Sequence, residues 1–174
     1  FFYPIIMAFF WMTGGVYYYL RRERNAPKPD APPPMRRTPL VSILVPCFNE
    51  EDHIVSTITA LSAQVYPDFE IIAIDDGSRD RTPELLDALV ADHPRLRVVH
   101  LAQNQGKANA LRMGTLAATS DYLVCVDSDA TLDPHAVRWM VGHLIDGPRV
   151  GAVTGNPRIR NRTSLMGRMQ IGEF

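Results

Sequence analysis

The sequence predicts an α/β fold: a mostly parallel sheet with helices on both faces, preceded by one transmembrane helix. Two patterns lead to this prediction. Between residues 40 and 160, short apolar runs alternate with longer segments whose apolar residues recur at helical spacing. Nearly continuous apolar strands joined by helices are typical of a parallel sheet that is covered on both faces. Before this region, residues 1–20 carry no charge and are rich in aromatic side chains.

Residues 1–20 are predicted to span a membrane, because a spanning helix needs about 20 apolar residues. Residues 17–19, all tyrosine, fit the aromatic belt of a membrane interface, and Arg21, Arg22 and Arg24 follow at once. Arginines clustered on that flank predict that the rest of the chain lies on the cytoplasmic side. A secretory signal is disfavoured because no basic n-region or small-residue cleavage site is present. A soluble aromatic core helix is the alternative.

A basic, proline-rich linker is predicted at residues 21–39, where six prolines lie among charged side chains. Such a composition cannot bury a core and favours extended polyproline geometry, which makes a semi-rigid spacer. The globular domain is predicted at residues 40–174.

The first half of this domain is predicted to contain two strands and two helices. Residues 40–46 form the first apolar strand, and the following helix presents a stripe of Ile54, Ile58, Leu61 and Val65. Residues 70–74 form the second strand. Thr82-Pro83 begins the next helix, because proline is favoured in a first helical turn, and Pro94 limits its extent.

The second half continues the alternation. The third strand is predicted at residues 97–101 and the third helix at residues 108–118. The fourth strand covers residues 122–126, and Asp133-Pro134 opens the fourth helix. A fifth strand is predicted at residues 150–154.

Polar clusters follow the first four predicted strands. In a parallel sheet, ligands bind beyond the carboxyl ends of the strands, so these clusters are expected to gather at one edge. They are Pro46–Glu50, Asp75–Asp80, Asn104–Lys107 and Asp127–Asp129.

Asp127 and Asp129 are the strongest candidates for a metal site. Side chains alternate along a strand, so two aspartates one residue apart are expected to point the same way. Such carboxylates repel each other unless a positive charge lies between them, and a hard divalent cation shared with substrate phosphates supplies that charge. The alternative is an ordinary turn after the strand, which Asp and Ser favour.

Three further residues are candidates for nucleotide binding. Asp75 and Asp76 could accept hydrogen bonds from a base N–H or a ribose hydroxyl, although an Asx-turn would also explain them. Lys107 begins a predicted helix, where its ammonium and the backbone N–H groups can meet phosphate. The alternative for Lys107 is a solvated position in the first helical turn.

Several classes of protein are disfavoured. The net charge of −1 gives no field that would attract nucleic acid, and no nucleic-acid partner is expected. A phosphate loop of P-loop type, a G-x-G-x-x-G motif after the first strand and an H-E-x-x-H zinc motif are all missing from the sequence. Cys47 and Cys125 lie in apolar runs and are predicted to be packed thiols.

Four segments resemble, in the right order, the motifs of family 2 glycosyltransferases. They are Val41–Glu50, Ile74–Thr82, Asn104–Leu111 and Val126–Asp129. The resemblance covers residues 40–160. It implies a GT-A fold, which is Rossmann-like with a mostly parallel sheet, and a metal-dependent hexosyltransferase that inverts the anomeric carbon of a UDP-sugar donor.

The resemblance also implies roles for individual residues. The nucleotide sugar is expected to contact Pro46, Asn49, Glu50, Asp75, Asp76, Lys107, Asp127 and Ser128. Asp127 and Asp129 are expected to hold Mg²⁺ or Mn²⁺ against the diphosphate. The aspartate that acts as catalytic base in this family is expected beyond Phe174, so the domain is expected to be incomplete at its C-terminal end.

Within the family, the chain resembles processive polysaccharide synthases most. This implies UDP-N-acetylglucosamine as donor and a growing polysaccharide as acceptor, namely the poly-β-1,6-N-acetylglucosamine of a biofilm matrix. It also implies a bacterial inner membrane location with a cytoplasmic catalytic domain, and a small membrane subunit as partner. A lipid-linked transferase that adds one sugar and a non-catalytic nucleotide-sugar-binding module are the alternatives.

Overall fold

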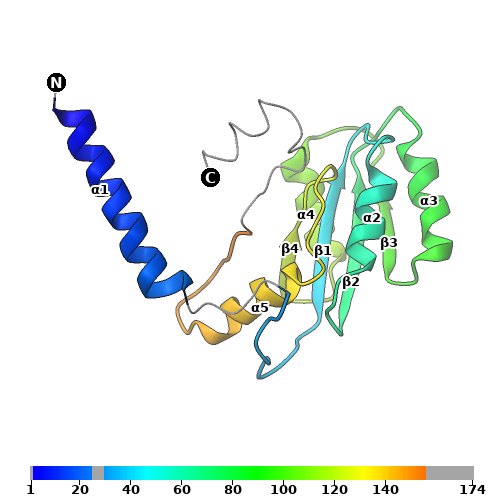
Figure 1. Cartoon of the computed structure of the whole chain (residues 1–174). Helices are drawn as coiled ribbons and strands as arrows, with labels where there is room; N and C mark the ends of the chain where they lie inside the picture. Colours follow the sequence, from blue (N-terminus) through cyan, green and yellow to red (C-terminus); the bar gives the residue numbers. More distant parts are fainter. Residues whose placement is uncertain (1, 25–29, 156–174) are drawn as a thin grey trace. The chain divides into compact units, whose positions relative to one another are not determined.

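The computed structural model describes residues 2–24 and 30–155, and the chain separates into two compact units. The unit that ends at Pro34 contains helix α1 (Tyr3–Tyr18), which continues as a π-helix over Tyr19–Glu23 (Figure 1). No helix among the described residues combines the length and the apolar character that crossing a membrane requires. The transmembrane helix predicted at residues 1–20 is therefore not confirmed.

The unit that begins at Met35 is built on a parallel four-stranded sheet. Its strands are β1 (Val41–Cys47), β2 (Phe69–Asp75), β3 (Leu96–His100) and β4 (Tyr122–Cys125), in the order β3-β2-β1-β4. All three pairings are parallel, and each strand end lies within one residue of its predicted position. The parallel sheet is therefore confirmed.

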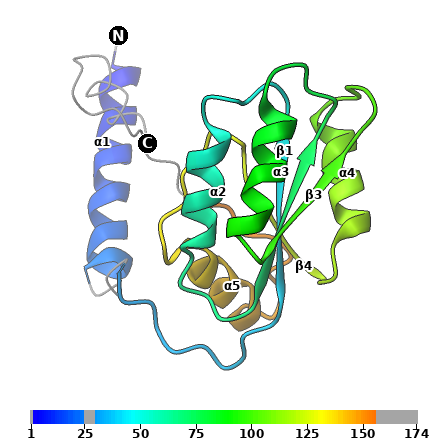
Figure 2. The same cartoon turned by 90° about the vertical axis from the view of Figure 1, so that its right-hand side faces the viewer.

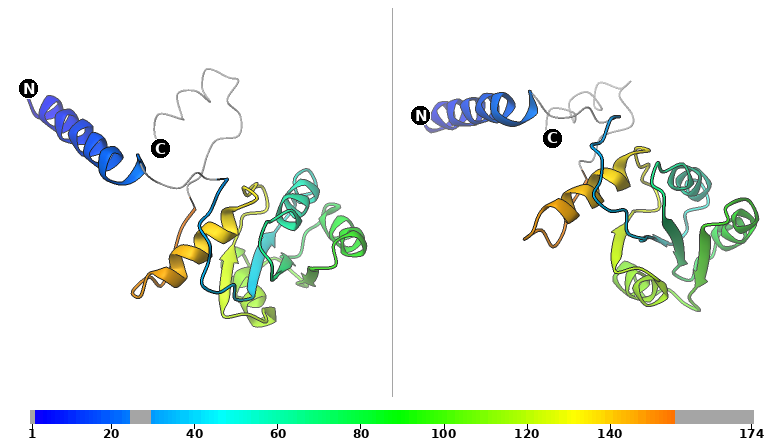
Figure 3. Two further views of the ribbon diagram at one scale, coloured as in Figure 1. Left: turned by 60° about the horizontal axis from the view of Figure 1, so that its bottom comes forward. Right: turned by 90° about the horizontal axis from the view of Figure 1, so that it is seen from below.

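Four helices connect and cover this sheet: α2 (Ile54–Ser62), α3 (Thr82–Asp92), α4 (Lys107–Ala117) and α5 (Ala136–Asp146). Figures 2 and 3 show α4 on one face and α2 and α3 on the other. Right-handed crossovers explain this arrangement. The chain moves in one direction from β1 to β2 and β3, then returns past β1 to β4, so the connection through α4 must cover the opposite face.

Successive side chains of β1 belong to two different hydrophobic cores. Ile43 and Val45 of β1 belong to the larger core, which α2, α3 and α5 cover. Leu44 belongs to the smaller core under α4. Gly114 of α4 lets that helix approach closely, because a Cβ atom built there would lie 2.7 Å from Cδ1 of Ile74.

Three details of the prediction are wrong. Residues 150–155 form no strand, because an apolar run becomes a strand only through pairing and no described strand pairs with them. Val65 lies beyond the end of α2 and is exposed. Cys125 is exposed as well, since among the described strands β4 pairs with β1 alone and α4 packs mainly on β1 and β2. Cys47 is buried as predicted.

Candidate functional site

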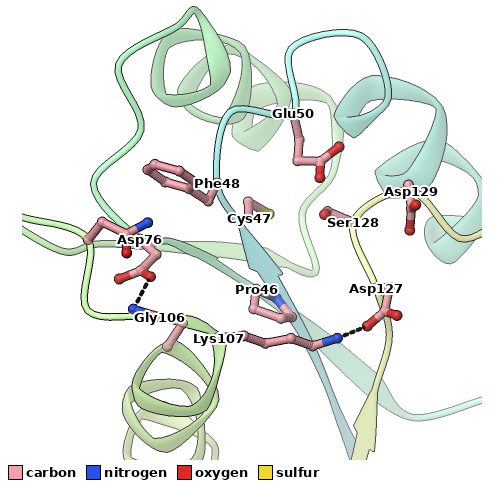
Figure 4. Close-up of a pocket in the computed structure, with 12 residues that line it drawn as sticks. Pro46, Cys47, Phe48, Glu50, Asp76, Gly106, Lys107, Asp127, Ser128 and Asp129 are labelled. Atoms are coloured by element: carbon pink, nitrogen blue, oxygen red, sulfur yellow. Dashed lines mark hydrogen bonds and ion pairs between the residues drawn. The ribbon is translucent and has the colours of Figure 1, made fainter.

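A pocket of about 420 Å³ opens at the carboxyl edge of the sheet, where the loops that follow β1 and β4 face the start of α4 (Figure 4). β1 and β4 are neighbours, but the connections that leave β1 and enter β4 run on opposite faces of the sheet. This is the topological switch point, where open α/β sheets bind ligands. Among the predicted site residues, those that line this pocket are Pro46, Glu50, Asp76, Lys107, Asp127, Ser128 and Asp129.

Asp127 and Asp129 lie in a turn, not on a strand as predicted. β4 ends two residues before Asp127, and the Ala130 N–H closes the turn by donating to the Asp127 carbonyl at 3.0 Å. Ser128 is buried, and its carbonyl accepts a hydrogen bond of 2.6 Å from Thr57 Oγ1 of α2. Both aspartates remain exposed and line the pocket, and their role as metal ligands stays a prediction.

Lys107 supplies the positive charge of this pocket. It is the first residue of α4, and its Nζ donates to Oδ1 of Asp127 at 2.5 Å. Both side chains are about three-fifths exposed, at 60% and 61%, so this ion pair is solvated. An ammonium at a helix N-terminus and next to a carboxylate can contact phosphate and carboxylate together.

Asp76 anchors the loop that leads into α4. Its side chain is buried, and its two oxygens accept hydrogen bonds from the backbone N–H groups of Gln105 (3.0 Å) and Gly106 (2.8 Å). Gly106 has a φ of +88°, which favours glycine at this position. Asp76 therefore positions the residues directly before Lys107 while lining the same pocket.

Asp75 and Asn49, the other two predicted site residues, line a second pocket of about 410 Å³. Phe48 and Asn104 line both pockets, so the two pockets are adjacent. Gly77 forms part of the wall of the second pocket with a φ of +68°, and a Cβ atom there would lie 2.7 Å from the backbone nitrogen of Asn104. The turn after β2 thus packs tightly against the loop after β3.

Hydrogen bonds join the loops that follow β1 and β2. The Asn49 N–H donates to Ser78 Oγ at 3.0 Å, and the Arg79 N–H donates back to Asn49 Oδ1 at 2.9 Å. The Glu50 N–H donates to Thr82 Oγ1 at 2.8 Å. Asn49, which was predicted to contact the nucleotide, uses its side-chain oxygen to hold the pocket wall.

Cys47 lies in the wall of the first pocket but is no candidate nucleophile. Burial, and then the nearby carboxylates of Asp75 and Glu50, raise the pKa of this thiol to about 12. A thiol with that pKa stays protonated at neutral pH, and the thiolate is the reactive form. Cys47 therefore lines the pocket as an unreactive, packed side chain.

The described residues contain no cluster of three or more His, Cys, Asp or Glu side chains that could hold a metal ion. Mg²⁺ and related ions do not need such a cluster, because they bind through one or two carboxylates and complete their ligands with water and substrate phosphates. The exposed pair Asp127 and Asp129 fits that mode, with Glu50 of the same pocket nearby.

The prediction missed several residues that shape the two pockets. Phe48 and Asn104 belong to the predicted polar clusters Pro46–Glu50 and Asn104–Lys107, and this membership could have identified them. His100 had no comparable signal, because its importance rests on a contact with Asp75, 25 residues away in the sequence.

Known proteins resemble this chain in sequence and in structure. The sequence model of Glycosyl transferase family 2 matches residues 42–173. A poly-beta-1,6-N-acetyl-D-glucosamine synthase of Staphylococcus epidermidis is 37% identical over 183 residues, and one of Staphylococcus aureus strain MSSA476 is 39% identical over 176 residues. Each match covers 99% of this chain and 42% of the relative, so the chain spans less than half of these relatives' length.

Two solved structures share the fold. The mannosyltransferase PcManGT from Pyrobaculum calidifontis, in complex with GDP-Man and Mn²⁺, has a TM-score of 0.68 and 31% identity over 82% of this chain and 43% of its own. Residues 1–349 of S. aureus TarS, in complex with UDP-GlcNAc, have a TM-score of 0.57 and 20% identity over 70% and 38%. The fold is therefore GT-A-like, and the chain belongs to glycosyltransferase family 2.

Proposed function

We propose that this chain binds the donor of an inverting, metal-dependent N-acetylglucosaminyltransferase. In this proposal, the donor is UDP-N-acetylglucosamine and the product is poly-β-1,6-N-acetylglucosamine of a biofilm matrix. The observation that carries the proposal is the pocket at the switch point, where Lys107 contacts the carboxylate of Asp127 and Asp129 lines the same pocket. The 37–39% identity to synthases of this polymer supports the choice of donor and product.

In the proposed complex, Lys107 contacts the diphosphate. Asp127 and Asp129 hold Mg²⁺ or Mn²⁺, which neutralises negative charge on the departing nucleotide when it is bound. Two features favour an anion next to these carboxylates: the Lys107 ammonium and the N-terminus of α4. Asp76 keeps this helix start in place through its hydrogen bonds to Gln105 and Gly106.

The uridine is proposed to lie where the two pockets adjoin, near Phe48 and Asn104. Phe48 is 42% exposed there, and an exposed aromatic ring can stack on a base. The hydrogen-bonded loops after β1 and β2 hold these walls before the ligand arrives, which lowers the ordering cost of binding.

We assign no residue of the described part as the base that deprotonates the acceptor hydroxyl. The proposed acceptor is the growing polysaccharide. A location at the bacterial inner membrane with a cytoplasmic donor site, and a small membrane subunit as partner, belong to the same proposal. The similarity to polymer synthases supports these points.

Calorimetry on the purified 174-residue chain in mild detergent tests the proposal. We expect UDP to bind in the presence of Mg²⁺ and to lose most of its affinity in EDTA. Asp127→Asn and Asp129→Asn should lose the effect of Mg²⁺. Asp121→Asn is the matched control, because it removes the same charge from an exposed residue just before β4, outside both pockets.

Two results would overturn the proposal: no binding of UDP under any condition, or equal binding with and without Mg²⁺ in all variants. A comparison of UDP-N-acetylglucosamine with GDP-mannose then tests the donor. Tighter binding of GDP-mannose would contradict the assigned sugar nucleotide and leave the metal site intact.

A further inference from the structure

The imidazole ring of His100, the last residue of β3, lies between two carboxylates. Its Nδ1 is 3.0 Å from Oδ2 of Asp75 on the neighbouring strand β2, and its Nε2 is 3.1 Å from Oδ1 of Asp87 on α3. A neutral imidazole carries one N–H and can donate to only one of these oxygens, whereas the imidazolium donates to both. The two contacts therefore favour the protonated ring.

Asp75 connects this ring to the wall of the second pocket. Its side chain is only 4% exposed, so it needs partners for its charge. Its Oδ1 accepts a hydrogen bond of 3.0 Å from the Ser78 N–H, and Ser78 Oγ in turn accepts from the Asn49 N–H. A continuous chain of contacts thus runs from α3 through His100 and Asp75 to the loop after β1.

We propose that His100 is a positioning residue of the nucleotide site and that its protonation strengthens binding of the nucleoside diphosphate. This inference rests on the proposed function and deepens it, because it concerns regulation of the same site. With a neutral ring, one of the two carboxylates faces a lone pair instead of an N–H. Even when the remaining N–H donates to the buried Asp75, that hydrogen bond is no longer charge-assisted and is weaker. The Asp75 turn then loses part of its support, and the pocket wall formed by Ser78 and Asn49 is less well ordered.

The electrostatic surroundings agree with this direction. The hydrogen bond to Asp75 is the largest influence and raises the pKa of His100 above its ordinary value of 6.5, against a lowering by burial; Asp87 raises it further. Within the described part of the chain, the charged groups in contact with the ring are these two carboxylates, one from β2 and one from α3. Because the pKa of His100 is raised, the stabilisation that its protonated ring gives to the Asp75 turn is complete below pH 6.5. This stabilisation is lost as the pH rises through the pKa of His100 in the folded state.

Calorimetric titrations of UDP with Mg²⁺ between pH 6 and pH 8.5 test the inference. UDP itself gains charge over this range, so the comparison is between the wild-type chain and His100→Gln. We expect the wild-type chain to lose at least about fivefold more affinity across the range than His100→Gln, a coupling of ordinary size. His93→Gln, at the end of α3 and outside both pockets, is the matched control and should follow the wild-type profile.

A second variant and a second measurement test the same coupling without disturbing the ring. Asp87 is exposed, and Asp87→Asn should move the pH dependence of UDP affinity to lower pH because it removes one of the two charges that favour the imidazolium. By reciprocity, bound UDP should raise the pKa of His100 in an NMR titration of its ring protons.

Parallel pH profiles in the wild-type chain and His100→Gln, or a ring pKa that UDP does not change, would overturn this inference. A uniform loss of affinity at every pH in His100→Gln would also overturn it, because that result indicates a purely structural role. Failure of UDP to bind at any pH would instead overturn the proposed function.

Discussion

Glu70 at the amino edge of the sheet and the pair Asp127 and Asp129 at the carboxyl edge differ in how many donors surround their carboxylates. At the amino edge, Glu70 of β2 has donors on both oxygens. Oε1 accepts from Ser42 Oγ (2.7 Å) and from the N–H and hydroxyl of Thr119 (2.8 and 2.6 Å), and Oε2 accepts from Arg97 Nη1 (2.9 Å). At the carboxyl edge, Asp127 has Lys107, and no described residue donates a hydrogen bond to the carboxylate of Asp129.

This difference distinguishes a carboxylate that stabilises the fold from carboxylates that can bind a ligand. Burial raises the pKa of Glu70, but the hydrogen bonds from Thr119 and Ser42, followed by the bond from Arg97, together outweigh it and lower this pKa to about 2. A carboxylate with this many donors stabilises the fold and has little capacity left for a ligand. Asp127 and Asp129 at the other edge are exposed and have fewer donors, so their oxygens remain available to a ligand. We therefore expect substitution of Glu70 to change stability, and substitutions of Asp127, Asp129 and their neighbour Lys107 to change binding.

The largest expected effect is at the amino edge. Glu70→Gln should lower the free energy of unfolding by about 2–3 kcal/mol, because the neutral amide cannot replace a carboxylate that accepts four hydrogen bonds. Urea denaturation measures this loss. Glu84→Gln, on an exposed residue in the first turn of α3, should cost no more than a few tenths of a kcal/mol. Weaker UDP binding in the folded Glu70→Gln variant would contradict the purely structural role of Glu70.

The same carboxylate predicts how stability depends on pH. The pKa of Glu70 is 4.5 when unfolded and about 2 in the folded chain, so its contribution is present above pH 4.5 and is lost as the pH falls toward 2. Urea denaturation at pH 6, 4.5 and 3 should show a steeper loss in the wild-type chain than in Glu70→Gln. Identical slopes would contradict the assigned pKa.

An intermediate effect is expected at Gly77, which belongs to the wall of the second pocket. Gly77→Ala should destabilise the chain by at least about 1–2 kcal/mol, because its φ of +68° disfavours a Cβ atom and the new atom would meet Gln103 and Asn104. UDP affinity should fall as well. Gly142→Ala on α5 meets nothing within 4 Å and should be neutral or slightly stabilising. Equal stability of the two variants would contradict the described turn.

A smaller effect, on binding alone, is expected at Lys107. Lys107→Gln should weaken Mg²⁺-dependent UDP binding by about tenfold, since it removes one charge-assisted contact to phosphate. Thermal denaturation should be nearly unchanged, because its ion pair with Asp127 is exposed and such pairs contribute little. A large loss of stability would show that Lys107 has the structural role assigned to Glu70.

The smallest effect concerns the two thiols. Cys125 is exposed and should react with a thiol reagent in the native chain, whereas Cys47 should react only after unfolding. Both thiols have a raised pKa, so both reactions should be slow at pH 7 and faster at pH 9. Mass spectrometry of the modified peptides checks the order. Modification of Cys47 first would contradict its placement in the pocket wall.

The strands and the site edge could be predicted from the sequence because they rest on local patterns. Apolar runs located β1 to β4 within one residue, and the rule for carboxyl ends placed Lys107, Asp127 and Asp129 at one pocket. The strand predicted at residues 150–154 was wrong, because pairing with another segment decides whether an apolar run becomes a strand.

The different partners of Asp75 and Asp76 could not be predicted from the sequence. Asp75 and Asp76 are adjacent, yet one faces His100 and the other faces the start of α4. Which pocket each of them lines depends on where α4 packs, and that depends on the long connection from β3 to β4. The contact of His100 with Asp75 is equally non-local.

The proposed function requires that Asp127 and Asp129 hold a divalent cation against a nucleoside diphosphate contacted by Lys107. Crystals of the chain grown with UDP and Mn²⁺ would locate this cation through the anomalous signal of manganese. We expect one strong peak within coordinating distance of both aspartates and of the diphosphate. A manganese peak elsewhere, or UDP bound away from this pocket with the Lys107–Asp127 ion pair intact, would contradict it.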